Sequence, residues 1–310
     1  MRNRFRDAML VVITAAVVAA LSLATQPTAG QVRVAARTAD GRPNLSGIWQ
    51  SMNTANWDLQ THAARAALMT VPGPAGPVPA APGLALGAVG GVPGGLGVVE
   101  GNEIPYLSAA AAKKKENGEN VLTRDPEVKC FLPGVPRAMY LPYPFQIIQS
   151  TTKIMMIFEY AAANRTIHLD KVDSPPVESW MGFSVGRWDR DTLVVDTTGL
   201  QEDTWFDRAG NFHSDALHVI ERFTPLTPDH LTYDVTIEDP KVFARPWKMS
   251  MPLYRRMERN AQIMEYKCVE FVEELMYGHL RKEQLITRWQ GDLGATGGRL
   301  VIDVTRGPRQ

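Results

Sequence analysis

The segment from Asp196 to Arg222 holds the densest group of side chains suited to acid–base chemistry. It reads DTTGLQEDTWFDRAGNFHSDALHVIER and sets His213, Asp215 and His218 in an H-x-D-x2-H spacing. On an extended chain His213 and Asp215 share a face, and a carboxylate beside an imidazole fixes its tautomer and raises its basicity. The spacing therefore indicates a general base, His213 oriented by Asp215, with Arg222 anchoring a substrate.

A metal site is a second interpretation of the same residues. His218 points to the opposite face of an extended chain, so three zinc or iron ligands would need a bulge at Ala216 or Leu217. The pattern favours a His–Asp pair over a divalent metal at His213 and Asp215, and it specifies no cofactor. A third interpretation stays open, in which these are turn residues that bond to the backbone.

The stretch GRWDRDTLVVDTTGL, residues 186–200, predicts a β-hairpin. Asp189 and Asp191 flank its turn, where Asp is favoured because it hydrogen-bonds the local backbone. Asp196 differs, since it lies at the far end of the second strand. We expect it at the mouth of a cavity.

Charged residues also interrupt apolar segments. In HVIERF either Glu221 or Arg222 must face inward, as a structural ion pair or a ligand anchor. The preceding hairpin also places charged or polar residues among apolar ones, at Glu159, Tyr160, Arg165 and His168. The candidate ligand-binding residues are Trp188, Asp196, Trp205, Tyr160 and Glu221.

The elements that must position these side chains are short strands. Residues 231–238 alternate, with Leu231, Tyr233, Val235 and Ile237 on one face, which is typical of a half-buried strand. Similar segments follow each other from Tyr143 to Glu270. They predict an all-β fold, an antiparallel meander that forms a lipocalin-like barrel or a sandwich. An apolar stripe in residues 269–289 predicts one C-terminal helix, and a short helix is expected near Ser108–Lys115.

The N-terminal residues 1–30 have the pattern of a signal peptide. Three arginines precede an apolar run from Ala8 to Ala24, and small residues follow. The alternative is an uncleaved anchor. We expect cleavage, a periplasmic or secreted protein and no later membrane span, with residues 31–310 as a single β-rich domain. Within it, residues 71–101 are rich in Gly and Pro, which predicts a flexible insertion.

The balance of charges limits the classes of partner that the protein can bind, and its two cysteines are candidates for a disulfide. The chain has 33 basic and 33 acidic residues, which argues against a general electrostatic grip on nucleic acid. An oxidising compartment allows Cys130 and Cys268 to form a disulfide. The alternative, a thiol nucleophile, lacks a catalytic motif around either residue. The sequence also contains no G-x-S-x-G, phosphate-binding glycine loop or H-E-x-x-H.

Several motifs together resemble a large family of exported bacterial proteins of unassigned function. They read DGRPNLSGIW, KCFLPGVPR, PYPFQIIQ, WMGFSVGRWDRDTLVVDTTG, HSDALHVIERF and IEDPKVFARPW. The resemblance implies a secreted β-rich fold and no established reaction. The family's hairpin turn carries Gly where this chain has Arg190, which puts a tight primed turn in doubt. Gly47-Ile48-Trp49 is separately similar to the G-x-W that opens lipocalin barrels.

Three functional hypotheses remain. The first is an exported barrel that binds a small, partly apolar molecule in its interior. The second is a hydrolase or lyase on the same barrel, using His213, Asp215 and Arg222. The third is an envelope-interaction protein that uses the Gly/Pro-rich segment. Whether the protein is an enzyme is left open by the sequence.

Overall fold

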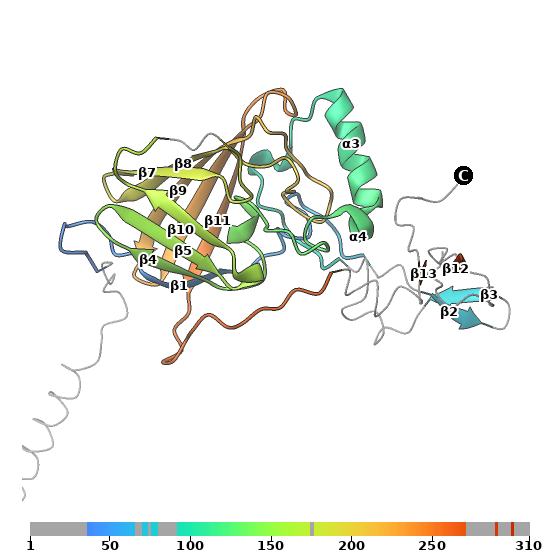
Figure 1. The fold of residues 1–310 in the computed structure, drawn as a ribbon, viewed down its shortest axis with the longest axis horizontal. Coiled ribbons are helices and arrows are strands. Elements are labelled where there is room, and N and C mark those ends of the chain that lie inside the picture. The colour runs from blue at the N-terminus through green and yellow to red at the C-terminus, as the bar shows by residue number, and fades with distance from the viewer. Residues whose placement is uncertain are drawn as a thin grey trace, which may run out of the picture. The chain divides into compact units, whose positions relative to one another are not determined.

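The alternating segments form a closed β-barrel in the computed structural model of the protein (Figure 1). The structure describes residues 36–65, 70–73, 76–79, 92–173, 177–270, 289–290 and 299–300. The nine barrel strands in these residues are β1 (Gly47–Ser51), β4 (Phe145–Gln149), β5 (Lys153–Phe158), β6 (Asn164–His168), β7 (Phe183–Asp189), β8 (Thr192–Thr198), β9 (His218–Thr227), β10 (His230–Glu238) and β11 (Trp247–Arg255). The predicted all-β barrel is confirmed.

The strand order is that of a meander with one parallel junction. Strands β4–β6 and β7–β11 pair antiparallel in sequence order, and β1 closes the barrel between β4 and β11. β6 and β7 instead pair in parallel, through Ile167 with Ser184 and His168 with Val185. A parallel pair needs a crossover rather than a hairpin, and the chain makes one between β6 and β7.

The inward face of the barrel is the core of the protein. On β10, Leu231, Tyr233, Val235 and Ile237 are each no more than 1% exposed, so the predicted alternation is confirmed. The interior side chains of the neighbouring strands are equally buried. Burial of this apolar surface stabilises the fold at roughly 25 cal/mol per Å² removed from water.

The N-terminal segment covers one end of the barrel. Leu45 is 1% exposed, and its carbonyl accepts a hydrogen bond from Trp49 Nε1 at 2.9 Å. Arg42 lies 5.9 Å from the ring of Trp188, and Arg37 pairs with Asp191 in the β7–β8 turn. The other aspartate of this hairpin, Asp189, pairs with Arg222 on β9. The predicted hairpin is confirmed, and its two aspartates pair with arginines of other segments.

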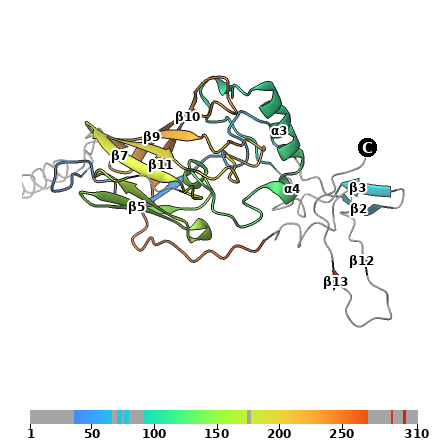
Figure 2. The same ribbon diagram turned by 45° about the horizontal axis from the view of Figure 1, so that its top comes forward.

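A cap of loops and helices covers the other end (Figures 1 and 2). It contains residues 199–217 and the helix α3 (Ser108–Glu119), which confirms and extends the short helix expected near Ser108–Lys115. Lys113 of α3 lies 4.5 Å from the ring of Phe212. The remaining short helices are α4 (Val121–Arg124), η1 (Glu100–Asn102), η2 (Arg137–Met139) and η3 (Tyr160–Ala162).

Two predicted segments lie outside the described residues. These are the signal peptide, residues 1–30, and nearly all of the C-terminal helix expected over 269–289. Short pairs of strands flank the gaps, β2 (Thr70–Gly73) with β3 (Gly76–Pro79) and β12 (Trp289–Gln290) with β13 (Arg299–Leu300). Among the helices that the structure describes, none combines the length and the apolar character needed to cross a bilayer.

The Gly/Pro-rich insertion contains more structure than its composition predicts. β2 and β3 pair antiparallel over residues 70–79, although a high Gly and Pro content disfavours regular structure. At its end, Val98 O accepts a hydrogen bond from Ser250 N at 3.0 Å, and Val99 pairs with Met249. The last residues of the segment therefore extend the barrel wall next to β11.

A disulfide joins Cys130 to Cys268, as predicted, with a Cα–Cα distance of 5.6 Å across a sequence separation of 138 residues. Residues after Arg256 leave β11 and run along the outside of the barrel to reach it (Figure 2). Closing so long a loop restricts the unfolded chain and favours the folded state in the chain-entropy model.

Arg190 supports a stability prediction. The β7–β8 turn has only two residues, and Arg190 adopts a φ of 55°, a region that disfavours side chains with a Cβ. The tight turn therefore forms without the glycine. We expect Arg190→Gly to raise the free energy of unfolding by about 0.5–1 kcal/mol in urea titrations, whereas Arg190→Ala, which keeps the Cβ, should leave it nearly unchanged.

Candidate functional site

His213 is a buried residue of the cap. Its Nδ1 lies 2.8 Å from Ser214 O, and its Nε2 lies 2.6 Å from Thr204 Oγ1. A carbonyl only accepts, so Nδ1 carries the proton and Nε2 accepts from the Thr204 hydroxyl. Burial lowers the pKa of His213, although the bond to Ser214 O opposes this effect. The imidazole is therefore held neutral, with its basic nitrogen facing a hydroxyl.

Asp215 is not part of this arrangement. Its Oδ1 accepts from Lys241 Nζ at 2.6 Å, on the surface, and that hydrogen bond lowers the pKa of Asp215. The chain turns at residues 215–216 instead of remaining extended, so the shared face assumed for His213 and Asp215 does not form. The predicted His213–Asp215 contact is absent, and Ser214 O takes the place of the carboxylate.

The turn after His213 is held by a different carboxylate. Asp239 is 3% exposed and accepts from Ser214 N at 2.6 Å and from Ser214 Oγ at 2.9 Å. His218 lies beyond the turn, on the outer face of the barrel. Within the described ranges, no three His, Cys, Asp or Glu side chains are grouped so that they could hold a metal ion.

Asp196 also lies on the outer face, in a row of charged side chains across four strands. It pairs with Arg187 of β7, and its Oδ1 lies 3.2 Å from His218 Nε2. The other nitrogen of His218 is 3.0 Å from Glu238 Oε2. The expected position at a cavity mouth is therefore not the one observed. Arg222 faces outward as well, paired with Asp189.

The inward charge predicted in HVIERF is Glu221, which has no exposed surface. Arg165 of β6 donates to both of its carboxylate oxygens, from NH1 at 3.0 Å and from NH2. Tyr233 donates to Glu221 Oε1 at 2.7 Å, and Thr197 and Ser184 complete the network around Arg165. Burial, followed by the charge of Glu221, raises the pKa of Tyr233. Glu221 is a structural partner of Arg165, and neither group is free for a ligand.

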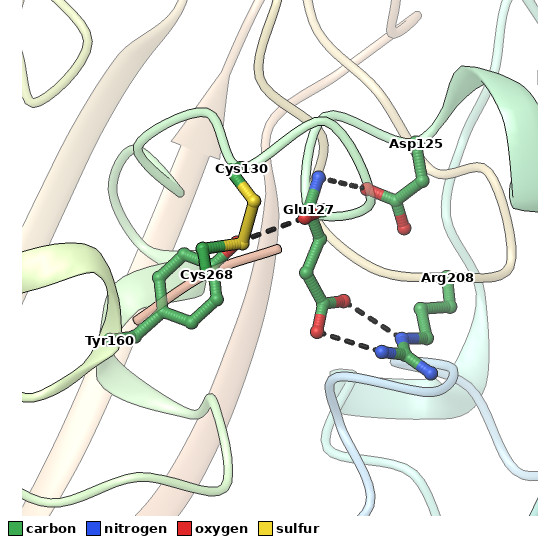
Figure 3. The surroundings of a disulfide bond; sticks show 6 residues. All are labelled: Asp125, Glu127, Cys130, Tyr160, Arg208 and Cys268. Atoms are coloured by element: carbon green, nitrogen blue, oxygen red, sulfur yellow. Dashed lines mark hydrogen bonds and ion pairs between the residues drawn. A yellow bond between two sulfur atoms is a disulfide. The ribbon is translucent and has the colours of Figure 1, made fainter. Parts of the chain in front are cut away.

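A second buried ionic cluster lies beside the disulfide (Figure 3). Arg137, 1% exposed, donates to Asn56 Oδ1, to both carboxylate oxygens of Asp125 and to Glu127 Oε2. Arg208 donates to both oxygens of Glu127 at 2.8 Å. Burial raises the pKa of Glu127, but the charges of Arg208 and Arg137 outweigh it and lower the pKa to about 2.

Tyr160 borders this cluster and forms part of its packing. Its hydroxyl donates to Glu127 O at 3.1 Å, and its ring contacts Tyr143 and Tyr266 at centroid distances of 5.8 and 5.1 Å. Burial is the main reason that the pKa of Tyr160 is raised. The predicted ligand contact is thus occupied by side chains of the protein itself.

Asp207 is a buried carboxylate that sequence reasoning missed. Its oxygens accept from Leu59 N, Ala209 N, Asn211 N and Asn211 Nδ2, at 2.6–3.1 Å. Burial, reinforced by Asp58, raises the pKa of Asp207 to about 7, although the N–H donors oppose the shift. Four donors use both oxygens, so Asp207 organises the loop of residues 205–212.

An aromatic cluster lies where the barrel meets the cap. Trp247, the first residue of β11, packs edge-on against Phe206 and Phe243 at 5.8 and 5.5 Å. The ring of His213 is 5.3 Å from that of Phe206, and Trp205 is 8% exposed in the same cap loop. Trp247 is 3% exposed, and its indole Nε1 has no hydrogen-bond acceptor among the described residues. A buried donor without an acceptor costs about 1–3 kcal/mol.

The structure therefore brings His213 together with Thr204, and Glu221 with Arg165. It separates Asp215, Asp196 and Arg222, which lie on the surface, and leaves Trp188 stacked with Arg42 at the opposite end of the barrel from the cap. The sequence did not identify Trp247 as a site residue, because a tryptophan in an alternating strand is normally predicted to belong to the core. Comparison with protein-family models, with curated proteins and with solved structures gave no match for this chain.

Proposed function

We propose that the protein is an exported β-barrel that binds a small, partly apolar molecule at the cap end of its interior, around Trp247. The observation that carries the proposal is the buried indole N–H of Trp247, which has no acceptor in the described part of the chain. A ligand with one acceptor atom would satisfy it, and the rings of Phe206 and Phe243 suit an apolar body.

Packing argues against a ligand halfway along the barrel. Halfway along the barrel, Glu221, Phe223 and Tyr233 have no exposed surface, which leaves no water-sized space beside them. Trp247 is also closed by the cap, so entry requires residues 199–217 to move. The disulfide and the signal-like N-terminal pattern support a periplasmic or secreted location. The shared motifs support membership of the exported family described above.

The test is native mass spectrometry of the full chain purified from the exported fraction. We expect a bound species on the wild-type protein and about five- to tenfold lower occupancy in Trp247→Phe, because one hydrogen bond is lost. Trp180→Phe, at a half-buried position outside the cluster, is the matched control. A wild-type protein that carries no molecule would refute binding, and equal occupancy in Trp247→Phe would place the ligand elsewhere.

A hydrolase or lyase is the second candidate, because His213 Nε2 faces the Thr204 hydroxyl at 2.6 Å as a base faces a nucleophile. Thr204→Val keeps the shape of the side chain and removes the hydroxyl. If this pair is catalytic, hydrolysis of a panel of aryl esters should fall at least about 100-fold in Thr204→Val and in His213→Ala. Unchanged turnover in both folded variants would leave the pair a structural contact.

A further inference from the structure

Residues 259–268 form a strap that crosses the outside of the barrel and ends at the disulfide (Figure 2). The strap has no regular secondary structure, and most of it is exposed to solvent. The last backbone bond of the ladder before it joins Arg256 N to Ile48 O at 2.8 Å. Two hydrogen bonds of the described strap reach the rest of the protein. Met264 N donates to the carboxylate of Glu159 at 3.0 Å, and the hydroxyl of Tyr266 forms a hydrogen bond with that of Tyr143.

Tyr266 provides the main packing contact of the strap. Its ring lies 4.9 Å from that of Tyr143 and 5.1 Å from that of Tyr160, measured between centroids. Tyr266 itself is only half-buried. The strap therefore covers two tyrosine rings of the barrel with few non-covalent contacts, and segments of this kind open at low free-energy cost.

The other end of the disulfide sits on a rigid turn (Figure 3). Cys130 N donates to Glu127 O, and Phe131 N donates to Pro126 O. The carboxylate of Glu127 is held by Arg208 and Arg137 in the buried cluster. Cys130 has a φ of 58°, a conformation that a residue with a Cβ rarely adopts.

We propose that the Cys130–Cys268 disulfide is a redox latch that holds the strap over Tyr143 and Tyr160. A dithiol reductant attacks the disulfide and forms a mixed disulfide, which its second thiol resolves. Two electrons and two protons pass to the cysteines, and the reductant leaves as a disulfide. The strap then detaches and uncovers both tyrosines.

The two ends of the disulfide are held by different numbers of contacts, and this difference decides which part of the chain moves on reduction. The turn around Cys130 keeps its ionic cluster whether or not the sulfur atoms are joined, because none of those hydrogen bonds involves a sulfur atom. Of its described contacts, the strap keeps the Met264 bond, the Tyr266–Tyr143 hydrogen bond and the Tyr266 ring contacts. The barrel strands pair without any residue of the strap, so the barrel stays folded after reduction.

The test is limited trypsin digestion of the folded full chain, before and after reduction by dithiothreitol, read by mass spectrometry. Arg259 and Lys267 supply cleavage sites in the strap. We expect cleavage at these sites to accelerate at least about tenfold on reduction, with no new cleavage at Arg222 within β9 or at Lys248 within β11. Hydroxyl-radical labelling of Tyr143 should rise in parallel.

Two variants separate the latch from the other contacts. Cys268→Ser should reproduce the reduced state without reductant, whereas Glu159→Gln, which removes the carboxylate that accepts from Met264 N, should change strap cleavage less than about threefold while the disulfide is intact. Unchanged strap cleavage after reduction would overturn the proposal, because other contacts would then hold the strap. Cleavage spreading to Arg222 in β9 and Lys248 in β11 would also overturn it, since the disulfide would then hold the whole fold together.

Discussion

Replacing Glu221 with Gln is expected to lower the free energy of unfolding by about 3–5 kcal/mol, measured by urea denaturation at neutral pH. The substitution leaves the Arg165 guanidinium, 1% exposed, without its carboxylate partner in the centre of the barrel. Gln can accept one hydrogen bond from Arg165, but it cannot compensate the buried charge. The Tyr233 hydroxyl also loses the ionised acceptor of its hydrogen bond.

The partner substitution gives the second arm of the same experiment. Arg165→Met removes the cation and leaves the Glu221 carboxylate with only the Tyr233 and Thr197 hydroxyls, so a loss of similar size is expected. The double variant with Met at both positions has no buried charge and should recover most of the stability, to within about 1–2 kcal/mol of the wild type.

The adjacent residue on β9 provides the control. Arg222 faces solvent and pairs with Asp189, and both side chains are about half exposed. Asp189→Asn should therefore cost no more than about 0.5 kcal/mol. If Glu221→Gln costs less than about 1 kcal/mol, the ion pair does not hold the barrel together, and Glu221 becomes available again as a ligand contact.

Local patterns predicted the strands and their inward faces well. The alternation around Tyr233 identified β10 and its buried side, and the apolar context of HVIERF correctly required one inward charge. Both inferences depend only on the two-residue period of a strand, which a sequence displays directly. The hairpin of residues 186–200 likewise followed from its flanking strands, whereas its tight turn, which Arg190 had put in doubt, was not predicted.

The candidate catalytic pair could not be placed by the same rule. The spacing of His213 and Asp215 puts both on one face only if the chain is extended, and Ser214 is instead drawn to Asp239, a residue 25 positions away. The partner of His213, Thr204, belongs to the same cap loop. Which side chains meet in a loop depends on tertiary contacts that local periodicity does not encode.

The buried ionic cluster illustrates the same point over longer distances. Asn56, Glu127, Arg137 and Arg208 come from different parts of the chain, and the one motif among them, KCFLPGVPR, which ends at Arg137, does not specify a partner. Long-range closure of the barrel brings them together, as it does β1 with β4 and β11. Single-segment reasoning assigns such charged residues to the surface, because paired burial is a property of the fold.

Glu127 is expected to make the protein sensitive to acid. Arg208 and Arg137 lower its folded-state pKa to about 2, whereas its ordinary value is 4.5. Since the folded pKa lies below the unfolded one, the stabilisation is complete above about pH 5 and is lost as the pH falls toward 2. The difference corresponds to about 3 kcal/mol of unfolding free energy, which urea denaturation at pH 7, 5 and 3 would measure.

Glu127→Gln should remove this acid-dependent loss while lowering stability at neutral pH, because Arg208 and Arg137 lose the charge that they surround. Glu119→Gln is the matched control. This glutamate is 62% exposed and pairs with Lys115 on α3, so the dependence of stability on acid pH should stay that of the wild type. If the free energy of unfolding falls equally with pH in the wild type and in Glu127→Gln, then the carboxylate titrates normally and its two arginines do not stabilise its charge in solution.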